Sequence, residues 1–224
     1  MPPIGSQIIK NWLIDFTKQV QSGNITFHNE ASLQVNLVCF VRQILKSNPA
    51  YKGYKVDVDA NIAQAVKCPN FKTRCGKRNI DVVIFHGDSI IDLSTSEDKY
   101  AIELKFPTNG QYPEQMFKFI QDIAFMEEAQ GFGHTMQNAS WFNGSFCLTF
   151  ADDPNFYQQT GRKVSKSIYK YFRNCPNPPI TGQIANPIAN SNPKQLNIVR
   201  TYTVNWIPSS TSPNNTLKYY LFSI

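Results

Sequence analysis

The chain has 224 residues, of which 42% are hydrophobic and 17% charged, and its formal net charge is +6. This composition can bury a hydrophobic core and excludes an intrinsically disordered chain. The length fits one large domain or a core with an appendage. The positive charge favours a polyanionic partner through electrostatic steering, although charge alone does not define a fold.

No stretch of the sequence approaches the roughly 18 uninterrupted apolar residues that a membrane span requires. The N-terminus lacks the basic start and apolar run of a signal peptide. The five cysteines are scattered along the chain, and an odd number fits reduced thiols better than a disulfide framework. The sequence therefore predicts a cytoplasmic protein with no membrane contact.

Two amphipathic helices are predicted in the first part of the chain. From Ser6 to about Gln21 apolar side chains recur at helical spacing, and Gly23 follows as a stop. The second helix runs from about Asn29 to Lys46. Asn29 is its expected N-cap, and Glu30 stands in the first turn, where the helix dipole favours an acid.

The pattern then changes to the two-residue period of strands. Residues 54–58 alternate between apolar and charged side chains, as in a half-buried strand. A basic connection from Cys68 to Lys77 follows. The elements predicted after it are the strands Asn79–Phe85 and Tyr100–Phe106, a helix from Pro113 to about Gln130, and the buried strand Ser145–Phe150.

This order predicts an α/β fold with a mixed central β-sheet flanked by helices. Three sequential strands favour an antiparallel meander, and the helix then crosses over to a parallel fourth strand. Residues 1–160 would form this core with the N-terminal helix, and residues 161–224 a C-terminal extension packed on the same domain. The extension is expected to hold a basic helix at about Gly161–Arg173, a Pro/Asn-rich loop at Asn174–Pro193, and a hairpin of the strands Thr201–Ile207 and Lys218–Ser223.

Three charged residues interrupt the apolar strands. Asp81 follows Ile80 in one strand, and Glu103 and Lys105 stand two apart in the next, so that they project from the same face. Burying such charges costs several kcal/mol unless they are paired or hold a metal ion. A structural ion pair at the end of a sheet is the plain interpretation, and a metal-dependent site is the functional one.

These residues resemble a known signature. Ile80-Asp81 and Glu103-Leu104-Lys105, separated by the 21 residues 82–102, are similar to the D…(D/E)-x-K motif of the PD-(D/E)xK nuclease superfamily. The order of helix, three strands, helix and strand resembles the restriction-endonuclease-like core of that family, over about residues 25–151. Ile80 replaces the proline that names the motif, at a position where members of the family vary.

The resemblance implies a metal-dependent cutting centre. Asp81 and Glu103 would hold Mg²⁺, for which Mn²⁺ can substitute, and the Leu104 carbonyl could complete the protein's ligands. The ion would activate a water molecule and stabilise charge on a phosphate. Lys105 would orient that water or help to deprotonate it, and would balance the developing negative charge.

Two residues of the second helix are further candidates. Glu30 resembles the helix acid that many members of the family add to the site. Its alternative role is that of an acid favoured by the helix dipole alone. Gln34 lies one turn further on, faces the same way and could assist.

The expected function is that of a Mg²⁺-dependent DNA endonuclease, of the type II restriction or defence class. Restriction enzymes commonly act as homodimers, so the resemblance allows a homodimer here. One alternative is a repair, recombination or transposition nuclease that recognises DNA structure. Another is a nucleic-acid-binding protein that keeps the fold without catalysis.

Basic residues precede the strand that carries Asp81, and they are the expected phosphate contacts: Lys72, Arg74, Lys77 and Arg78. The basic residues between Arg162 and Arg173 form a second candidate surface. On the helix that follows Glu103, the sequence does not decide whether Gln115, Gln121 or Asp122 faces the site. A zinc site at Cys68 and Cys75 is disfavoured, because a second pair of ligands is lacking.

Overall fold

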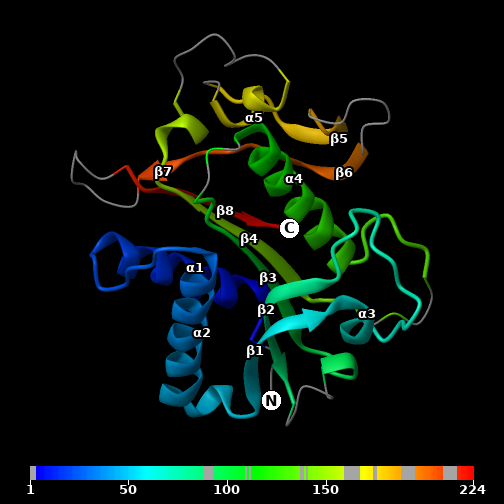
Figure 1. Ribbon diagram of the computed structural model, residues 1–224. Helices are drawn as coiled ribbons and strands as arrows, with labels where there is room; N and C mark the ends of the chain where they lie inside the picture. The colour runs from blue at the N-terminus through cyan, green and yellow to red at the C-terminus, as the bar shows by residue number, and fades with distance from the viewer. Residues whose placement is uncertain are drawn as a thin grey trace.

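The computed structural model is a mixed α/β structure built around a six-stranded sheet with helices on both faces (Figure 1). The predicted α/β architecture is therefore confirmed. No helix in the described part of the chain is long and apolar enough to cross a membrane. The structure describes residues 4–87, 93–108, 110, 112–136, 139, 141–158, 167–173, 176–187, 195–208 and 216–224.

Two helices cover one face of the sheet, α1 (Ser6–Gln21) and α2 (Glu30–Ser47). Both form because apolar side chains recur on one side of each helix. Asn29 caps α2 as predicted: its side chain accepts from the Ser32 N–H, and the Ser32 hydroxyl accepts in return from the Asn29 N–H. The residues that the two helices bury are Ile9, Trp12, Leu13, Phe16, Val20, Leu33, Leu37, Val38 and Val41.

The predicted meander is present as three antiparallel neighbours, β1 (Tyr54–Asn61), β2 (Asn79–His86) and β3 (Lys99–Lys105). Along β2 successive side chains enter different cores, because they point to opposite faces of the sheet. Val82 packs in the core beneath α1 and α2, whereas Val83 packs in the core beneath α4. The connection from β1 to β2 contains a short helix that the sequence did not reveal, α3 (Ile62–Ala65).

Helix α4 (Tyr112–Ala129) crosses the opposite face of the sheet and leads to β4 (Gly144–Ala151). Strand β4 runs parallel to β3, with Glu103 beside Cys147, so the predicted crossover is confirmed. Every residue of β4 is buried, which explains its uninterrupted apolar sequence.

The chain beyond residue 160 completes the same sheet. Strand β8 (Lys218–Ser223) pairs antiparallel with β4, and the short β7 (Ile207–Pro208) pairs with β8, giving the order β1-β2-β3-β4-β8-β7. A second sheet of β5 (Ile180–Ala185) and β6 (Gln195–Tyr202) lies on the outer side of α4 (Figure 1). The boundary predicted at residue 160 lies outside the described residues.

Three predictions for the C-terminal part need correction. The segment predicted as a Pro/Asn-rich loop at Asn174–Pro193 contains the strand β5, which buries its own residues Ile180 and Ile184 in the core. The prediction of one continuous strand at Thr201–Ile207 is wrong for residues 203–206, because β6 ends at Tyr202 and β7 begins at Ile207. Of the predicted basic helix, residues 161–166 lie outside the described residues.

The described remainder of that segment forms two short turns of helix in place of a long one. They are η4 (Ser167–Tyr169) and α5 (Lys170–Arg173), and other short helical turns among the described residues include η1 (Pro49–Tyr51) and η3 (Pro154–Phe156). Ile168 and Phe172 are buried, so this segment is held by apolar packing.

Candidate functional site

Strands β2 and β3 bring Asp81 and Glu103 together. Val82 is paired with Ile102 in the antiparallel register, so the preceding residue Asp81 lies across from Glu103. The Asp81 N–H donates to Glu103 Oε1 at 3.4 Å, and the Leu104 N–H donates to Asp81 Oδ2 at 2.8 Å. Glu103 and Lys105 alternate with buried residues of the α1 and α2 core, and they therefore face α4.

Lys105 connects β3 with α2. Its Nζ donates to Glu30 Oε1 at 2.9 Å, and the Phe106 N–H donates to Glu30 Oε2 at 3.2 Å. Glu30 stays 40% exposed, whereas the Lys105 side chain is only 14% exposed. The predicted acid of α2 is therefore in direct contact with the predicted lysine, and this end of the cluster opens to solvent.

Gln34 lies one helical turn after Glu30 and also reaches the cluster. Its Nε2 donates to the main-chain carbonyl of Asp81 at 2.6 Å. The bond fixes α2 against β2 beside the candidate site. Gln34 thus acts on the backbone of Asp81 and not on its carboxylate.

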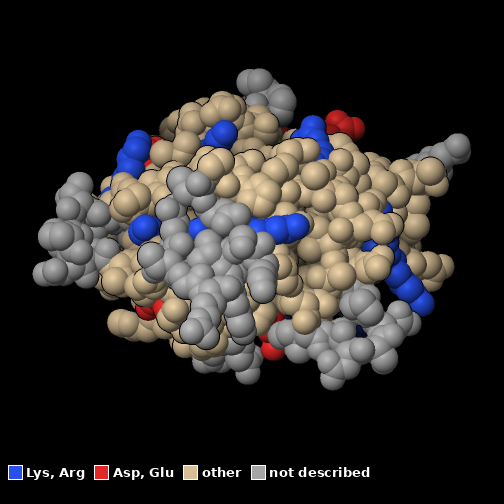
Figure 2. Space-filling model, turned by 90° about the horizontal axis from the view of Figure 1, so that it is seen from above, with Lys and Arg blue, Asp and Glu red and all other residues tan. Residues whose placement is uncertain are grey.

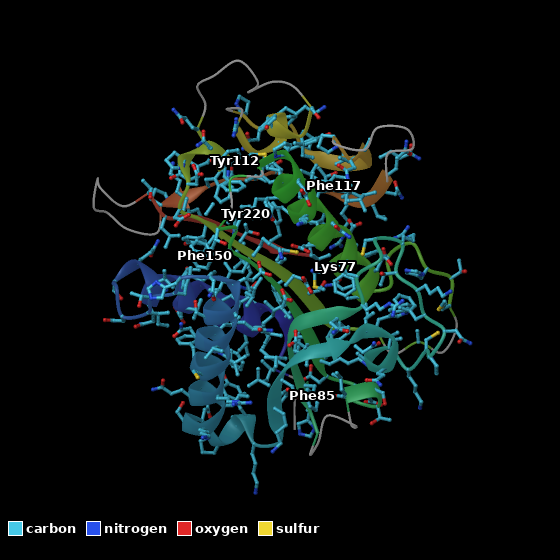
Figure 3. All side chains as sticks on the ribbon, in the orientation of Figure 1. Lys77, Phe85, Tyr112, Phe117, Phe150 and Tyr220 are labelled. Atoms are coloured by element: carbon cyan, nitrogen blue, oxygen red, sulfur yellow. The ribbon has the colours of Figure 1, made fainter. Side chains whose placement is uncertain are left out.

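Two charged residues outside the predicted motif complete the cluster. Lys77 Nζ donates to Glu103 Oε2 and, at 2.6 Å, to Asp122 Oδ1. Asp122 comes from α4, and its Oδ2 lies 3.8 Å from Lys105 Nζ. Figure 3 shows Lys77 in the interior, between α4 and the central strands.

Only partial signals in the sequence point to these two residues. Lys77 was predicted to contact phosphate from the surface, yet its side chain is 23% exposed and points to the carboxylates. Asp122 was one of three polar residues on the following helix whose direction was undecided. A carboxylate in the apolar stripe beside Ile123 was the available signal, because such a group needs a partner when buried.

The two lysines remain charged in this environment. Burial by itself would lower the pKa of Lys77, but the carboxylates of Asp122 and Glu103 outweigh it and raise the pKa above its ordinary value. For Lys105 burial also acts downward, and Asp122 together with Glu30 raises the pKa above the ordinary value. Both side chains are therefore ammonium ions near neutral pH.

For the carboxyl groups of Asp81 and Glu103 the surroundings favour the neutral form, whereas for the two lysines they favour the charged form. Burial raises the pKa of Asp81 above its ordinary value, although Lys77 lowers it in part. Burial raises the pKa of Glu103 well above its ordinary value, against the attraction of Lys77 and with the help of repulsion from Asp81 and Asp122. Asp81 and Glu103 therefore ionise less readily than exposed carboxyl groups do, chiefly because they are buried.

The carboxylate oxygens of the cluster are the type of ligand that a hard cation prefers, but their present arrangement differs from that of a metal site. Within the residues that the structure describes, no group of three or more acidic, His or Cys side chains is arranged to hold a metal ion. The carboxylates are instead arranged around the Lys77 ammonium, which shows that a positive charge is stabilised between Glu103 and Asp122. Burial raises the pKa of the neighbouring Cys147 thiol well above its ordinary value, so this side chain is a neutral thiol in the metal-free protein.

The predicted phosphate contacts separate into two pairs. Arg74 holds Glu128 of α4, through its N–H at 2.9 Å and through Nε at 3.5 Å, and Lys77 points into the cluster. Lys72 and Arg78 are exposed, and both line a hollow of about 380 Å³ in the α3–β2 connection. These two therefore keep the position that a phosphate contact requires.

The second predicted basic surface consists of the basic residues between Arg162 and Arg173, of which residues 167–173 are described. Figure 2 looks onto the face that carries β5, β6 and α5, and its visible Lys and Arg side chains are separated by uncharged surface. Arg173 lies over the rings of Tyr169 and Tyr112, at 4.3 and 5.8 Å. The described part of this face does not form a continuous basic band.

Comparison with known proteins adds no relative. No family model, no curated protein and no solved structure matches the chain. The interpretation of the site therefore rests on its residues and their geometry.

Proposed function

We propose that this chain is a metal-dependent nuclease of the PD-(D/E)xK type, with a restriction-endonuclease-like core, that hydrolyses phosphodiester bonds in DNA. The observation that carries the proposal is the meeting of Asp81, Glu103 and Lys105 at one point of β2 and β3, with Glu30 bound to the lysine. A structural ion pair requires one acid for one base. This cluster brings the carboxylates of Asp81, Glu103, Asp122 and Glu30 together with two ammonium groups, those of Lys77 and Lys105.

Asp81, Glu103 and the carbonyl of Leu104 would hold a Mg²⁺ ion. The Leu104 N–H points to Asp81, and in a strand the carbonyl of a residue points to the same neighbour as its N–H. When bound, the ion lowers the pKa of its water and neutralises charge on a phosphate. Glu30, Gln34 and the paired strands hold these ligands in place before substrate arrives.

Lys105 would orient the attacking water or help to deprotonate it, and would balance charge on the phosphate. In the metal-free protein Asp122 and Glu30 raise its pKa above the ordinary value, so the side chain rests as an ammonium ion. Glu30 keeps the ammonium in place from the solvent side. Substrate would enter from this side, where the cluster is open.

The test is cleavage of unmethylated supercoiled plasmid DNA in Mg²⁺. We expect nicking by the wild-type chain, and its loss in Asp81→Asn, Glu103→Gln and Lys105→Met, each with unchanged secondary structure by circular dichroism. Glu97→Gln and Lys55→Met are matched controls, because both residues are exposed and lie on or just before strands of the same sheet.

Two results would contradict the proposal. Cleavage by any of the three site variants at the wild-type rate would show that the nuclease activity lies elsewhere. DNA binding without cleavage, in Mg²⁺ and in Mn²⁺, would identify a non-catalytic nucleic-acid-binding protein. If cleavage occurs, sequencing of the ends separates a fixed recognition site from recognition of DNA structure.

A further inference from the structure

The Lys77 ammonium occupies the position between the carboxylates of Glu103 and Asp122. It is bound to both, through Glu103 Oε2 and through Asp122 Oδ1 at 2.6 Å. Lys77 does not belong to a strand: it lies in the irregular connection between α3 and β2. A side chain from a connection therefore supplies the positive charge at the centre of the site.

Asp122 has an unused acceptor at the same place. Its residue is only 5% exposed, and Oδ2 is buried without a hydrogen-bond donor among the described residues. The nearest cation is Lys105 Nζ, at 3.8 Å. A buried carboxylate oxygen with no donor is costly, so this oxygen is free to take a ligand that the site acquires.

The connection that carries Lys77 is anchored on both sides of the lysine. Gln121 Nε2 donates to the Cys75 carbonyl at 2.7 Å, and the Ile62 N–H donates to the Arg78 carbonyl at 2.8 Å. The hollow of about 380 Å³ in this connection is lined by Lys77 itself, beside Thr73, Gly76 and Arg78. The lysine side chain therefore has open space on its outer side while its backbone stays fixed.

A divalent ion and the ammonium cannot share the position. Both require the oxygens of Glu103, and like charges at such short range repel strongly in a buried site. Exchange is favourable because the ion would carry two charges to a cluster of three carboxylates, Asp81, Glu103 and Asp122.

We infer that Lys77 is a tethered cation that holds the metal position in the metal-free protein, and that Asp122 is a third carboxylate ligand once a divalent ion displaces it. This inference rests on the proposed function, because it assigns the metal site of the nuclease. Metal binding is then an exchange reaction. Lys77 weakens the binding of the ion and prevents the carboxylates from repelling one another in its absence.

The first test measures Mn²⁺ binding to the full chain without DNA, by electron paramagnetic resonance of the free ion. Lys77→Met should bind Mn²⁺ at least tenfold more tightly than the wild type, because the competing ammonium is gone. The double variant Lys77→Met with Asp122→Asn should bind Mn²⁺ at least tenfold more weakly than Lys77→Met alone, because a ligand is lost. Lys55→Met, an exposed lysine of β1, should bind as the wild type does.

The second test uses the wild-type chain and does not depend on the folding of a variant. Acetylation by acetic anhydride, read by mass spectrometry, should increase severalfold at Lys77 when Mn²⁺ saturates the site, and should not change at Lys55. An equal reactivity of Lys77 with and without bound Mn²⁺ would overturn the exchange.

The outcomes separate the inference from the proposed function. Equal Mn²⁺ affinity of the wild type and Lys77→Met would overturn the role of Lys77, while plasmid nicking could still support a nuclease. Absence of Mn²⁺ binding in both proteins would overturn the metal site and the inference together. Tight Mn²⁺ binding without nicking would contradict the nuclease proposal and leave the exchange of Lys77 standing.

Discussion

Glu30 connects the first turn of α2 to two groups of the candidate site. One carboxylate oxygen accepts from Lys105 Nζ and the other from the Phe106 N–H. The alternative role of Glu30, an acid that only interacts favourably with the helix dipole, requires neither of these two hydrogen bonds. The two bonds argue that Glu30 positions the lysine.

We predict that Glu30→Gln slows plasmid cleavage at least tenfold, on the order of 1.4 kcal/mol, with little change in melting temperature. The amide keeps an acceptor for the Phe106 N–H but removes the charge that holds Lys105. Initial rates and thermal melts on one preparation measure both effects. Glu114→Gln, at a partly exposed first-turn acid of α4, is the control. Wild-type cleavage combined with a lower melting temperature would restrict Glu30 to a role in helix stability.

The ionisation of Glu103 should make the stability of the metal-free protein depend on pH. Its pKa is raised in the folded state, chiefly by burial, so the folded state favours the protonated acid. The stability from this group is fully present below the ordinary pKa of a glutamate and is lost as the pH rises through the raised pKa. Asp81 acts with the same sign.

The expected result is a fall in the free energy of unfolding above about pH 4.3 in the wild-type chain with EDTA. Glu103→Gln should have a smaller pH dependence, since its amide does not ionise. Urea unfolding at intervals between pH 5 and 8 measures both slopes. Identical slopes in the two proteins would show that Glu103 is not the group that titrates.

The sequence predicted the parts of the site that depend on strand geometry. Alternation placed Glu103 and Lys105 on one face, and the antiparallel neighbour placed Asp81 beside them. Lys77 could not be placed, because its direction depends on an irregular connection without periodicity. Asp122 was undecided because α4 is buried on most of its circumference, so hydrophobic spacing does not distinguish the side that faces the cluster.

At the level of elements, one buried acid joins α4 to the second sheet. Glu127 accepts from the N–H groups of Val199 and Arg200 at 2.8 and 2.7 Å, and from the Tyr202 hydroxyl at 3.1 Å. Its residue is fully buried. Strand β6 is therefore attached to the outer side of α4 by a carboxylate as well as by apolar packing.

We predict that Glu127→Ala lowers the free energy of unfolding by roughly 3 kcal/mol, because it leaves three donors without an acceptor. Urea denaturation measures the change, and Glu114→Ala is the matched control on the same helix, where a partly exposed acid paired only with Lys118 should matter little. A loss no larger than that of the control would mean that water replaces the carboxylate and that packing alone holds β6.

The C-terminal strands show where local pattern was insufficient. Strand β6 does carry a pattern, since Leu196 and Ile198 are buried and alternate with exposed neighbours. Strand β5 carries a weaker one, and the prolines before it favour a loop. Its conformation is fixed by pairing with β6 and by burial of Ile180 and Ile184, and such non-local contacts are not visible in a short segment.

At the scale of the molecule, the exposed cations of the α3–β2 connection predict how DNA is held. Lys72 and Arg78 are exposed, and Arg74 is exposed too but is bound to the buried Glu128. Lys77 is bound to the buried Glu103 and Asp122. If the chain cuts DNA as proposed, the exposed side chains of this connection, which leads into the strand that carries Asp81, are the expected phosphate contacts. Phosphate contacts there would depend on salt concentration because they release counterions.

Replacing Lys72 and Arg78 together by alanine should weaken DNA binding and lower the log-log salt slope by roughly 1.8, since each contact contributes about 0.9. Binding is measured in Ca²⁺ over a range of salt concentrations. The control is the double alanine variant of Lys55, which is exposed on β1, and Lys118, which is partly exposed on α4. An unchanged slope would remove the connection from the DNA path.

The position of β8 affects how the chain is made. Strand β4 is fully buried between β3 and β8, yet 66 residues separate the end of β4 from the start of β8. At ribosomal rates of about 5–20 residues per second, β4 waits roughly 3 to 13 s for that neighbour. During this time the nascent chain presents an apolar strand with one unpaired edge, which is the kind of surface that promotes aggregation or recruits chaperones. The pairing that buries β4 is therefore also a late step in biosynthesis.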